Sequence, residues 1–393
     1  MLRAYKYRLY PNKVQSELID KHIGCCRFIY NLALETKQMA YLGSKVSLSC
    51  IDLVNQIPAL KAEYEWLKEV DSQSLQQSII DMDKAFTKFF KGQSKFPNFK
   101  KNKGTQSFRN PHGNKVAVKD NKILLPKFSK AGIKIIIDRP HKGEIKSTTI
   151  SRTSTGKYFV SVLCDTGKNL PNKKAVKDKT TVGIDLGIKS FIVTSNGIKI
   201  DNPKYLKQSI GRLKVLQRRM RNKKKGSNNQ KKAYRKINII HEKITNQRKD
   251  FLHKTSTDII KNHNTICLED LNILGMVKNH KLAQSISDAG WGEFIRQIKY
   301  KAEWSGKNVL QIPTFEPSTK ICSECGCAKH DLTLADREWI CGFCNTTHDR
   351  DVNAAINIKK YCLKNTPKGI RGVPVEMLVL AKSKKQEVNY RKV

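Results

Sequence analysis

Hydrophobic and polar residues alternate at the start of the chain, where Tyr5, Tyr7 and Leu9 are separated by charged residues. A period of two is typical of a β-strand, so we predict a strand over residues 2–10. The period then becomes helical, with apolar positions three or four residues apart over 14–33 and 75–90. Short β-like runs return at 122–125, 133–137 and 157–163. These patterns predict a β unit that is split by a helical insertion.

The second half of the chain begins with a polar segment over 167–179, rich in Lys, Asn and Pro, where we place a domain boundary. Long basic helices are predicted over 205–254, with a break at 223–227. Little pattern remains after about residue 364, which predicts a basic, disordered tail. Short buried strands are predicted at 181–187, 191–194, 266–269 and 309–312, and a helix from Asp351.

Charge narrows the class of partner. The 393 residues include 75 Lys and Arg against 34 Asp and Glu, a formal net charge of +41. Such a charge favours a polyanionic partner, with nucleic acid ahead of an anionic membrane surface. No run approaches the roughly 18 apolar residues of a membrane span, and the N-terminus lacks the apolar core of a signal peptide. We therefore expect a cytosolic protein with no membrane partner.

Four of the eleven cysteines form two C-x-x-C pairs, Cys322 with Cys325 and Cys341 with Cys344, separated by fifteen residues. This spacing predicts one structural Zn²⁺ with four thiolate ligands and no open position. The alternative is a set of unconnected core or redox cysteines. Cys327 has the wrong spacing for a ligand, and His330 and His348 flank the site as less favoured ligands.

Three carboxylates follow short apolar segments or open a helix: Asp185, Glu269 and Asp351. Acids from distant segments that converge can hold two divalent ions about 4 Å apart, which suits phosphodiester hydrolysis. The alternative for each acid is a turn or helix N-cap, and Asp351 in particular would make a good cap. Spacing alone leaves the two interpretations about even.

A resemblance adds to this pattern. The segments 183–187, 268–271 and 349–355, with the cysteine pairs before the last, resemble the motifs of the transposon-encoded TnpB family. Members of this family are RNA-guided DNA endonucleases related to type V CRISPR effectors. Further matches are Leu252-His253-Lys254, the run from Asp288 to Gly292, and Pro317-Ser318-Thr319-Lys320. The resemblance covers about residues 1–362.

The resemblance implies a multidomain α+β fold and a two-metal site of Mg²⁺, or Mn²⁺, on Asp185, Glu269 and Asp351. The partners would be a guide RNA and double-stranded target DNA in a prokaryotic cytosol or nucleoid. Asp349 is kept as a less favoured substitute for Asp351. The implied parts are a wedge β-barrel (1–12 and, with the linker, 109–180), a helical recognition insert (13–108), an RNase H-like RuvC nuclease domain (181–320 and 351–364), a zinc-ribbon target-nucleic-acid-binding insert (321–350) and the tail (365–393).

The resemblance also points to residues around the acids. Arg337 matches an arginine that relatives place near the scissile strand, although a plain surface arginine is an equal alternative. By resemblance, the polar helix start at 72–77 reads a short duplex motif beside the target, with Gln76 as the candidate and an exposed helix start as the alternative.

Basic residues predict where nucleic acid binds. Residues 204–254 hold eighteen Lys and Arg against only Glu242 and Asp250. The segment from Lys95 to Arg109 interleaves rings with charges, which would suit unpaired bases, although Phe96 and Phe99 could equally be core residues. The predicted contacts besides Gln76 are Arg109, Arg218, Arg219, Lys223, Lys224 and Lys225.

Three functions are compared. The first is RNA-guided, two-metal DNA cleavage beside a transposon-adjacent motif. The second is a guide-directed DNA-binding repressor, which the intact acids argue against. The third is a transposase proper, which falls behind because we find no His-x-His pair with a nearby Tyr.

Overall fold

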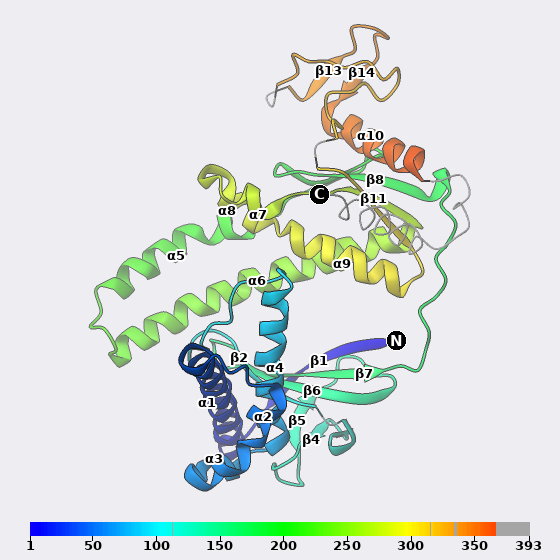
Figure 1. Cartoon of the computed structure of the whole chain (residues 1–393). Coiled ribbons are helices and arrows are strands. Elements are labelled where there is room, and N and C mark those ends of the chain that lie inside the picture. The colour runs from blue at the N-terminus through cyan, green and yellow to red at the C-terminus, as the bar shows by residue number, and fades with distance from the viewer. Residues whose placement is uncertain (112, 315, 334–335, 367–393) are drawn as a thin grey trace. The chain divides into compact units, whose positions relative to one another are not determined.

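The computed structural model describes residues 1–111, 113–314, 316–333 and 336–366 (Figure 1). The chain divides into two compact units, 1–169 and 170–393, and the division falls within the polar segment 167–179. Among the described residues, no helix combines the length and apolar character that crossing a bilayer requires.

A seven-stranded antiparallel sheet forms the base of the first unit, in the order β2-β6-β7-β1-β5-β4-β3. The predicted first strand is confirmed as β1, which pairs with both β5 and β7 and so lies inside the sheet. Closure of this sheet into a barrel remains a prediction. The strands are β1 (Leu2–Tyr10), β2 (Gln106–Asn110), β3 (Ala117–Lys119), β4 (Lys122–Leu124), β5 (Ile133–Ile136), β6 (Glu144–Arg152) and β7 (Tyr158–Asp165).

Helices fill the sequence between β1 and β2. Asn12 caps the first helix, and Asp71 caps the fourth by accepting a hydrogen bond from the Ser74 amide. Gln106 pairs with Arg152, so residues 106–108, which we assigned to the helical insert, belong to the sheet instead. The helices are α1 (Lys13–Ser44), α2 (Cys50–Asn55), α3 (Ile57–Glu63) and α4 (Ser72–Phe90), with a 3-10 turn at Glu65–Glu69.

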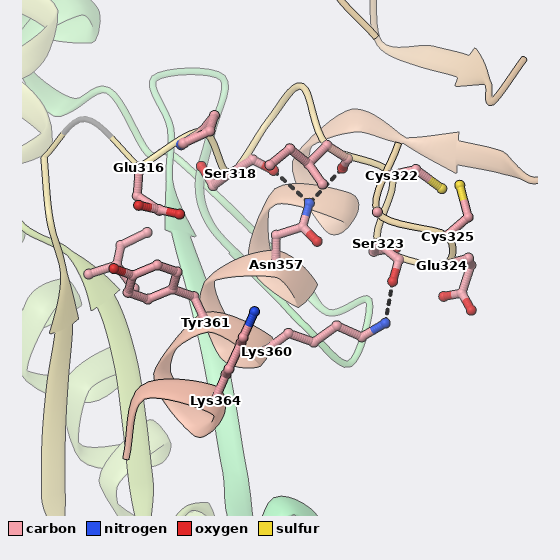
Figure 2. Close-up of a pocket in the computed structure, with 14 residues that line it drawn as sticks. Glu316, Ser318, Cys322, Ser323, Glu324, Cys325, Asn357, Lys360, Tyr361 and Lys364 are labelled. Carbon is pink, nitrogen blue, oxygen red and sulfur yellow. Dashed lines mark hydrogen bonds between the residues drawn. The ribbon is translucent and has the colours of Figure 1, made fainter. Parts of the chain in front are cut away.

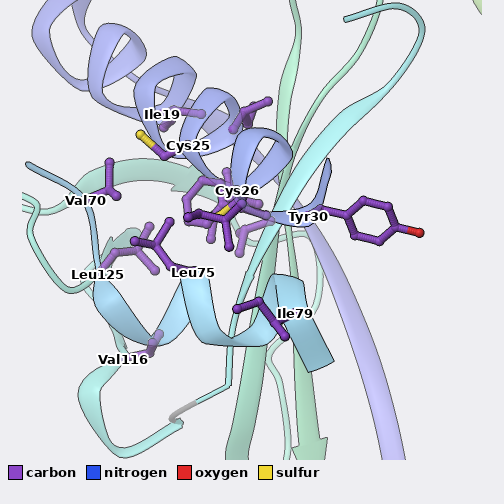
Figure 3. Close-up of a cluster of buried hydrophobic side chains, with 14 of the residues drawn as sticks. Ile19, Cys25, Cys26, Tyr30, Val70, Leu75, Ile79, Val116 and Leu125 are labelled. Carbon is purple, nitrogen blue, oxygen red and sulfur yellow. The ribbon is translucent and has the colours of Figure 1, made fainter. Parts of the chain in front are cut away.

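The core of the first unit joins these helices to the sheet. Figure 3 shows side chains of α1 and α4 among buried residues of the neighbouring segments. Cys26 of α1 is buried and donates to the Ser74 carbonyl of α4 over 3.4 Å. Burying a large apolar side chain such as Leu75 or Ile79 stabilises the fold by about 1.5–3 kcal/mol.

The second unit is built on a mixed sheet in the order β10-β9-β8-β11-β12. The strands β8, β11 and β12 run parallel, and β9 and β10 complete an antiparallel edge. The predicted strands over 181–187, 191–194, 266–269 and 309–312 are confirmed. The bounds are β8 (Thr181–Leu186), β9 (Ser190–Thr194), β10 (Lys199–Asp201), β11 (Thr265–Glu269) and β12 (Asn308–Ile312).

Helices cover both faces of this sheet (Figure 1). The even positions of β8 and β11, such as Ile184 and Leu268, belong to a core with side chains of the two helices α6 (Asn228–Asn262) and α9 (Trp291–Trp304). On the opposite face, Cys267 packs against Ile358 of α10 (Arg350–Asn365). The residues on the α10 face are therefore the odd positions, which include both strand-end acids.

A helical hairpin carries the basic segment. α5 (Tyr205–Arg221) and α6 pair through a small cluster in which Leu213 contacts Ile237, Ile240 and Ile244. The predicted break over 223–227 is confirmed, although α6 continues beyond the predicted end at 254. The remaining elements are the helices α7 (Ile273–Met276) and α8 (His280–Ala289) and the paired strands β13 (Glu338–Ile340) and β14 (Thr347–Asp349).

Candidate active site and metal centre

Two of the predicted acids lie side by side at the end of parallel strands. The register pairs Gly183 with Cys267 and Ile184 with Leu268, so Asp185 and Glu269 come next on neighbouring strands. Both acids occupy odd positions and share the face that α10 covers. The third acid, Asp351, lies in the first turn of α10, which packs on β8. Asp185, Glu269 and Asp351 therefore gather at one edge of the sheet.

Gly183 allows α10 to approach β8 closely. A Cβ atom at this position would lie 2.0 Å from the Ala355 carbonyl oxygen of α10. A glycine inside a strand commonly marks such an approach of another backbone. Because glycine has no side chain, Gly183 allows the close spacing between the helix that carries Asp351 and the strand that carries Asp185.

The structure shows which of the two acids in Asp349-Arg350-Asp351 is the N-cap of α10. Asp349 is the N-cap, because its Oδ1 accepts from the backbone amides of Asp351 and Val352 at 3.1 and 3.0 Å. Its Oδ2 also pairs with Lys199 at 2.5 Å. The capping alternative that we considered for Asp351 is therefore wrong, and the cap is its neighbour.

Burial and the neighbouring acids both affect the ionisation of Asp185. Burial, reinforced by the carboxylates of Glu269 and Asp351, raises the pKa of Asp185 to about 7, and Arg350 opposes the shift. Burial and neighbouring negative charges both disfavour the ionised form of a carboxyl group, which is why the pKa rises. A bound cation would relieve this repulsion, and carboxylate oxygens are the ligands that Mg²⁺ prefers. The donor set therefore fits a divalent ion.

Two of the acids have protein partners in this structure. Asp351 pairs with Arg350 at 3.3 Å and with Arg337 at 3.6 Å, while Glu269 accepts from Ser318 Oγ at 2.6 Å. Across the described part of the chain, the four cysteines are the group of three or more potential ligands whose donor atoms all lie within 4.8 Å of one another. The ligand atoms of the three acids are spaced more widely than those of the four cysteines, and two arginine side chains pair with Asp351.

A pair of asparagines connects α10 to the segment that leads into the cysteine pairs. Asn357 donates to the carbonyls of Ser318 and Ile321 at 2.7 and 2.6 Å, and Asn353 donates to Ile321 at 2.7 Å. Figure 2 shows the Asn357 contacts, together with Lys360, which donates to the Ser323 carbonyl. Because Ser318 in turn binds Glu269, these contacts link the helix of one acid to the side chain of another.

The four cysteines form a compact cluster next to the segment that Asn353 and Asn357 hold. The Sγ atoms of Cys322 and Cys344 are 3.6 Å apart, as are those of Cys325 and Cys341. A tetrahedral zinc with Zn–S bonds of about 2.3 Å requires S–S edges of about 3.8 Å. Hydrogen bonds from Thr346 lower the pKa of Cys344 to about 6, which favours a thiolate. The geometry fits Zn²⁺, and Cys327 lies outside the cluster.

His348 lies beside the cluster without belonging to it. Its ring nitrogen Nε2 is 3.0 Å from Cys322 Sγ, at hydrogen-bond distance, and its ring packs on Trp339. A histidine that contacts a ligand sulfur in this way orients the ligand and is not itself one of the four. The position of His348 near the second cysteine pair did not by itself predict this contact.

The predicted nucleic-acid contacts lie on different elements. Gln76 is half-buried on α4, and Arg109 on β2 donates to Ser147 Oγ at 3.1 Å. The other five are exposed at the end of α5 and in the turn before α6: Arg218, Arg219, Lys223, Lys224 and Lys225. Phe96 and Phe99 are 42% and 47% exposed, so the core alternative for them is wrong.

Three contributors to the site were not singled out from the sequence. Gly183 left a signal, since it interrupts an apolar strand. Ser318 and Arg350 lie within motifs that carried the resemblance, but their roles were not predicted, because those roles depend on segments that are distant in sequence or on a side-chain direction.

A highly basic α+β chain with three acids on one face of a mixed sheet, and a four-cysteine knuckle inserted before the third, has the build of a nucleic-acid-processing protein. Family models support this class. A model described as "Probable transposase" matches residues 161–280, and one described as "Cas12f1-like, TNB domain" matches 291–358. A "Helix-turn-helix domain" model matches 1–45, where the structure has a strand and one long helix.

Whole-chain relatives are more specific. The chain is 38% identical over 360 residues to a Streptomyces pristinaespiralis protein named "Putative RNA-guided DNA endonuclease", covering 91% of this chain and 88% of the relative. It is 32% identical to "Putative RNA-guided DNA endonuclease InsQ" of Escherichia coli K12, covering 91% of each. The chain therefore belongs to the transposon-encoded TnpB family.

A solved structure supports the fold. The chain matches a Cas12f1 chain from a complex with single guide RNA and target DNA, with a TM-score of 0.57 at 16% identity. The match covers 88% of this chain and 83% of the other. The overall α+β architecture is thus that of the Cas12f proteins.

Proposed function

We propose that this protein is the RNA-guided DNA endonuclease of a transposon. In this proposal a guide RNA from the element's end pairs with one DNA strand, and the protein cleaves double-stranded DNA next to a short transposon-adjacent motif. The relatives at 38% and 32% identity carry this activity in their names, and the net charge of +41 suits a chain that holds RNA and DNA together. The protein would act in the prokaryotic cytosol or nucleoid.

The observation that carries the proposal is the convergence of Asp185, Glu269 and Asp351 on the α10 face of the sheet. We infer that this sheet and α10 form the RuvC nuclease domain. Bound divalent ions would activate water and stabilise the leaving oxygen. The protein supplies the carboxylates, and Ser318 orients Glu269 through their 2.6 Å hydrogen bond.

Arg337 has a proposed role at the same place. Its guanidinium is half-exposed and only 3.6 Å from Asp351, so it faces the space where a phosphodiester would lie against the acids. A guanidinium there would stabilise the charge that develops on the phosphate. Once metal neutralises Asp351, Arg337 would be released from its ion pair toward the nucleic acid.

The remaining parts are assigned by the same proposal. The sheet of the first unit would be the wedge barrel (1–12 and 106–180), its helices the recognition insert (13–105), and Gln76 and Arg109 would contact nucleic acid there. The cysteine knuckle (321–350) would bind target nucleic acid around one structural zinc. The α5–α6 turn, with Lys223, Lys224 and Lys225, would hold the phosphate backbone.

Reprogramming tests the proposal. Protein purified with its copurifying RNA should cut a DNA that matches the guide, and a changed guide segment should move the cut to the newly matched DNA. The matched control is Asp185→Asn, which should bind the same DNA without cutting it. Cleavage that stays at a fixed sequence, or that proceeds equally without RNA, would contradict the proposal. Guided binding without cleavage by the unmodified protein would favour the repressor.

A further inference from the structure

The first unit contains an apolar cavity that the cleavage reaction does not use. It has a volume of about 650 Å³ and lies between the C-terminal turns of α1 and α4. Four phenylalanines from α4 and the segment after it form one wall: Phe86, Phe89, Phe90 and Phe96. Tyr41 and Leu42 of α1 form the other. The volume is in the range of small-molecule and nucleobase pockets.

The rings of this wall are fixed by one another, yet they stay open to solvent. Phe96 packs edge-on against Phe86 and Phe89, with ring centroids 5.3 Å apart in both pairs. Phe90 is nevertheless 76% exposed, and Phe96 is 42% exposed. Preformed, exposed rings offer flat faces to a ligand at little ordering cost, whereas a core would have buried them.

The charge around the cavity indicates what kind of ligand lies on these rings. Residues 84–103 include seven lysines and no acidic residue. Lys37 lines the cavity and pairs with Asp83 at 2.8 Å, so this acid is neutralised by a lysine of the cavity wall. Lys88, Lys91 and Lys95 are exposed and lie within a few residues of the phenylalanines in the sequence. A second copy of this chain would bring the same positive charge to the cavity and be repelled.

We propose that this cavity, the phenylalanine pocket, binds unpaired bases of the guide RNA by stacking, with the surrounding lysines on the flanking phosphates. Rings among lysines are the common means of holding single-stranded nucleic acid without sequence preference, since every base has a π-face. The guide RNA is the occupant because it is the partner that the proposed function keeps on the protein before DNA arrives. The inference therefore rests on that function, and it adds a site for one part of the RNA.

The test compares single-stranded with double-stranded RNA. Full-length protein freed of copurifying RNA is titrated with a fluorescent oligouridine and with an RNA duplex of equal phosphate number. The Phe90→Ala and Phe96→Ala variants should each bind oligouridine about 5- to 30-fold more weakly, the equivalent of about 1–2 kcal/mol for one stacked base, and the duplex unchanged. Phe90→Trp should restore binding, and Phe90→Leu, which keeps apolar volume without a ring, should not.

Matched controls separate stacking from general effects. Ile51→Ala removes a 70%-exposed apolar side chain of the same unit and should leave both titrations unchanged. Equal weakening of single-stranded and duplex binding, or full rescue by Phe90→Leu, would overturn the proposal. So would a shift from dimer to monomer in light scattering on Phe90→Ala, since the pocket would then be an interface between copies.

A crosslinking experiment identifies the occupant. Guide RNA with 4-thiouridine in its unpaired segments should crosslink to peptides that contain Phe90 or Phe96 before any DNA is added. Crosslinks that form only with thiolated target DNA would overturn the assignment to RNA. These measurements need no cleavage, so a failure of the proposed endonuclease activity would be seen separately in the reprogramming assay.

Discussion

Gly183→Ala tests the claim that the α10–β8 spacing sets the geometry of the acids. The new Cβ would lie 2.0 Å from the Ala355 carbonyl oxygen, and real Cβ atoms essentially never come within 3.0 Å of such an atom. The helix must therefore retreat by about 1 Å, which carries Asp351 away from Asp185. Overpacking of this kind destabilises a fold by about 1–3 kcal/mol, and a 1 Å misplacement of reacting groups can lower a rate about 100-fold.

Three measurements separate the geometric effect from lost stability. We expect guided cleavage under single-turnover conditions to fall about 100-fold, DNA binding to persist, and the urea midpoint to decrease. Ile184→Val lies on the opposite face and should lower stability by about 0.5–1.5 kcal/mol with cleavage retained. Gly211→Ala has open space in α5 and should leave cleavage unchanged. Wild-type cleavage by Gly183→Ala would refute the reasoning.

Other outcomes follow from the same structure. Asp185→Asn, Glu269→Gln and Asp351→Asn should each abolish Mg²⁺-dependent cleavage while RNA-guided binding persists; full cutting would remove that residue from the site. Elemental analysis after mild chelation should find about one zinc per chain, which Cys341→Ser loses and Cys327→Ser keeps. Hydrogen bonds from Arg296 and Gln297 lower the pKa of Glu293 to about 2 from 4.5, so this carboxylate stabilises the fold above pH 4.5 and the contribution disappears as the pH falls towards 2. Glu293→Gln should accordingly lower the melting temperature at pH 7 and leave it equal to that of wild type near pH 2. An equal difference in melting temperature at both pH values would contradict this prediction.

Periodicity predicted most elements of the sheets, because their strands are buried and their patterns are uninterrupted. β1 was evident from the alternation of Tyr5, Tyr7 and Leu9, which are all buried in the structure. β6 was missed, since its polar residues Ser147 and Thr148 are buried through pairing with β7, which no local pattern reveals. The order of strands was also beyond reach, because pairing of β1 with β5 and β7 joins residues more than a hundred positions apart.

The candidate site was predictable in its chemistry and not in its contacts. The acids and cysteines were found because their residue types and spacing have few other uses. The ion pairs of Asp351 and the hydrogen bond to Glu269 depend on side-chain directions that only the folded chain fixes. Asp349 illustrates the limit, because two acids at a helix start are equivalent in sequence and the backbone alone decides which becomes the cap.

One helix connects the acids to the cysteine knuckle. α10 carries Asp351 in its first turn, and two and six residues later Asn353 and Asn357 hold the segment 318–321 through its backbone carbonyls. That segment leads directly into Cys322, while Ser318 at its start binds Glu269. A zinc bound at Cys322 would therefore also anchor the chain that positions Glu269, although the cysteine cluster lies outside the acid cluster. The proposed structural metal and the proposed catalytic acids would thus depend on the same short segment, and a disturbance of the cysteines would be transmitted through it to Glu269.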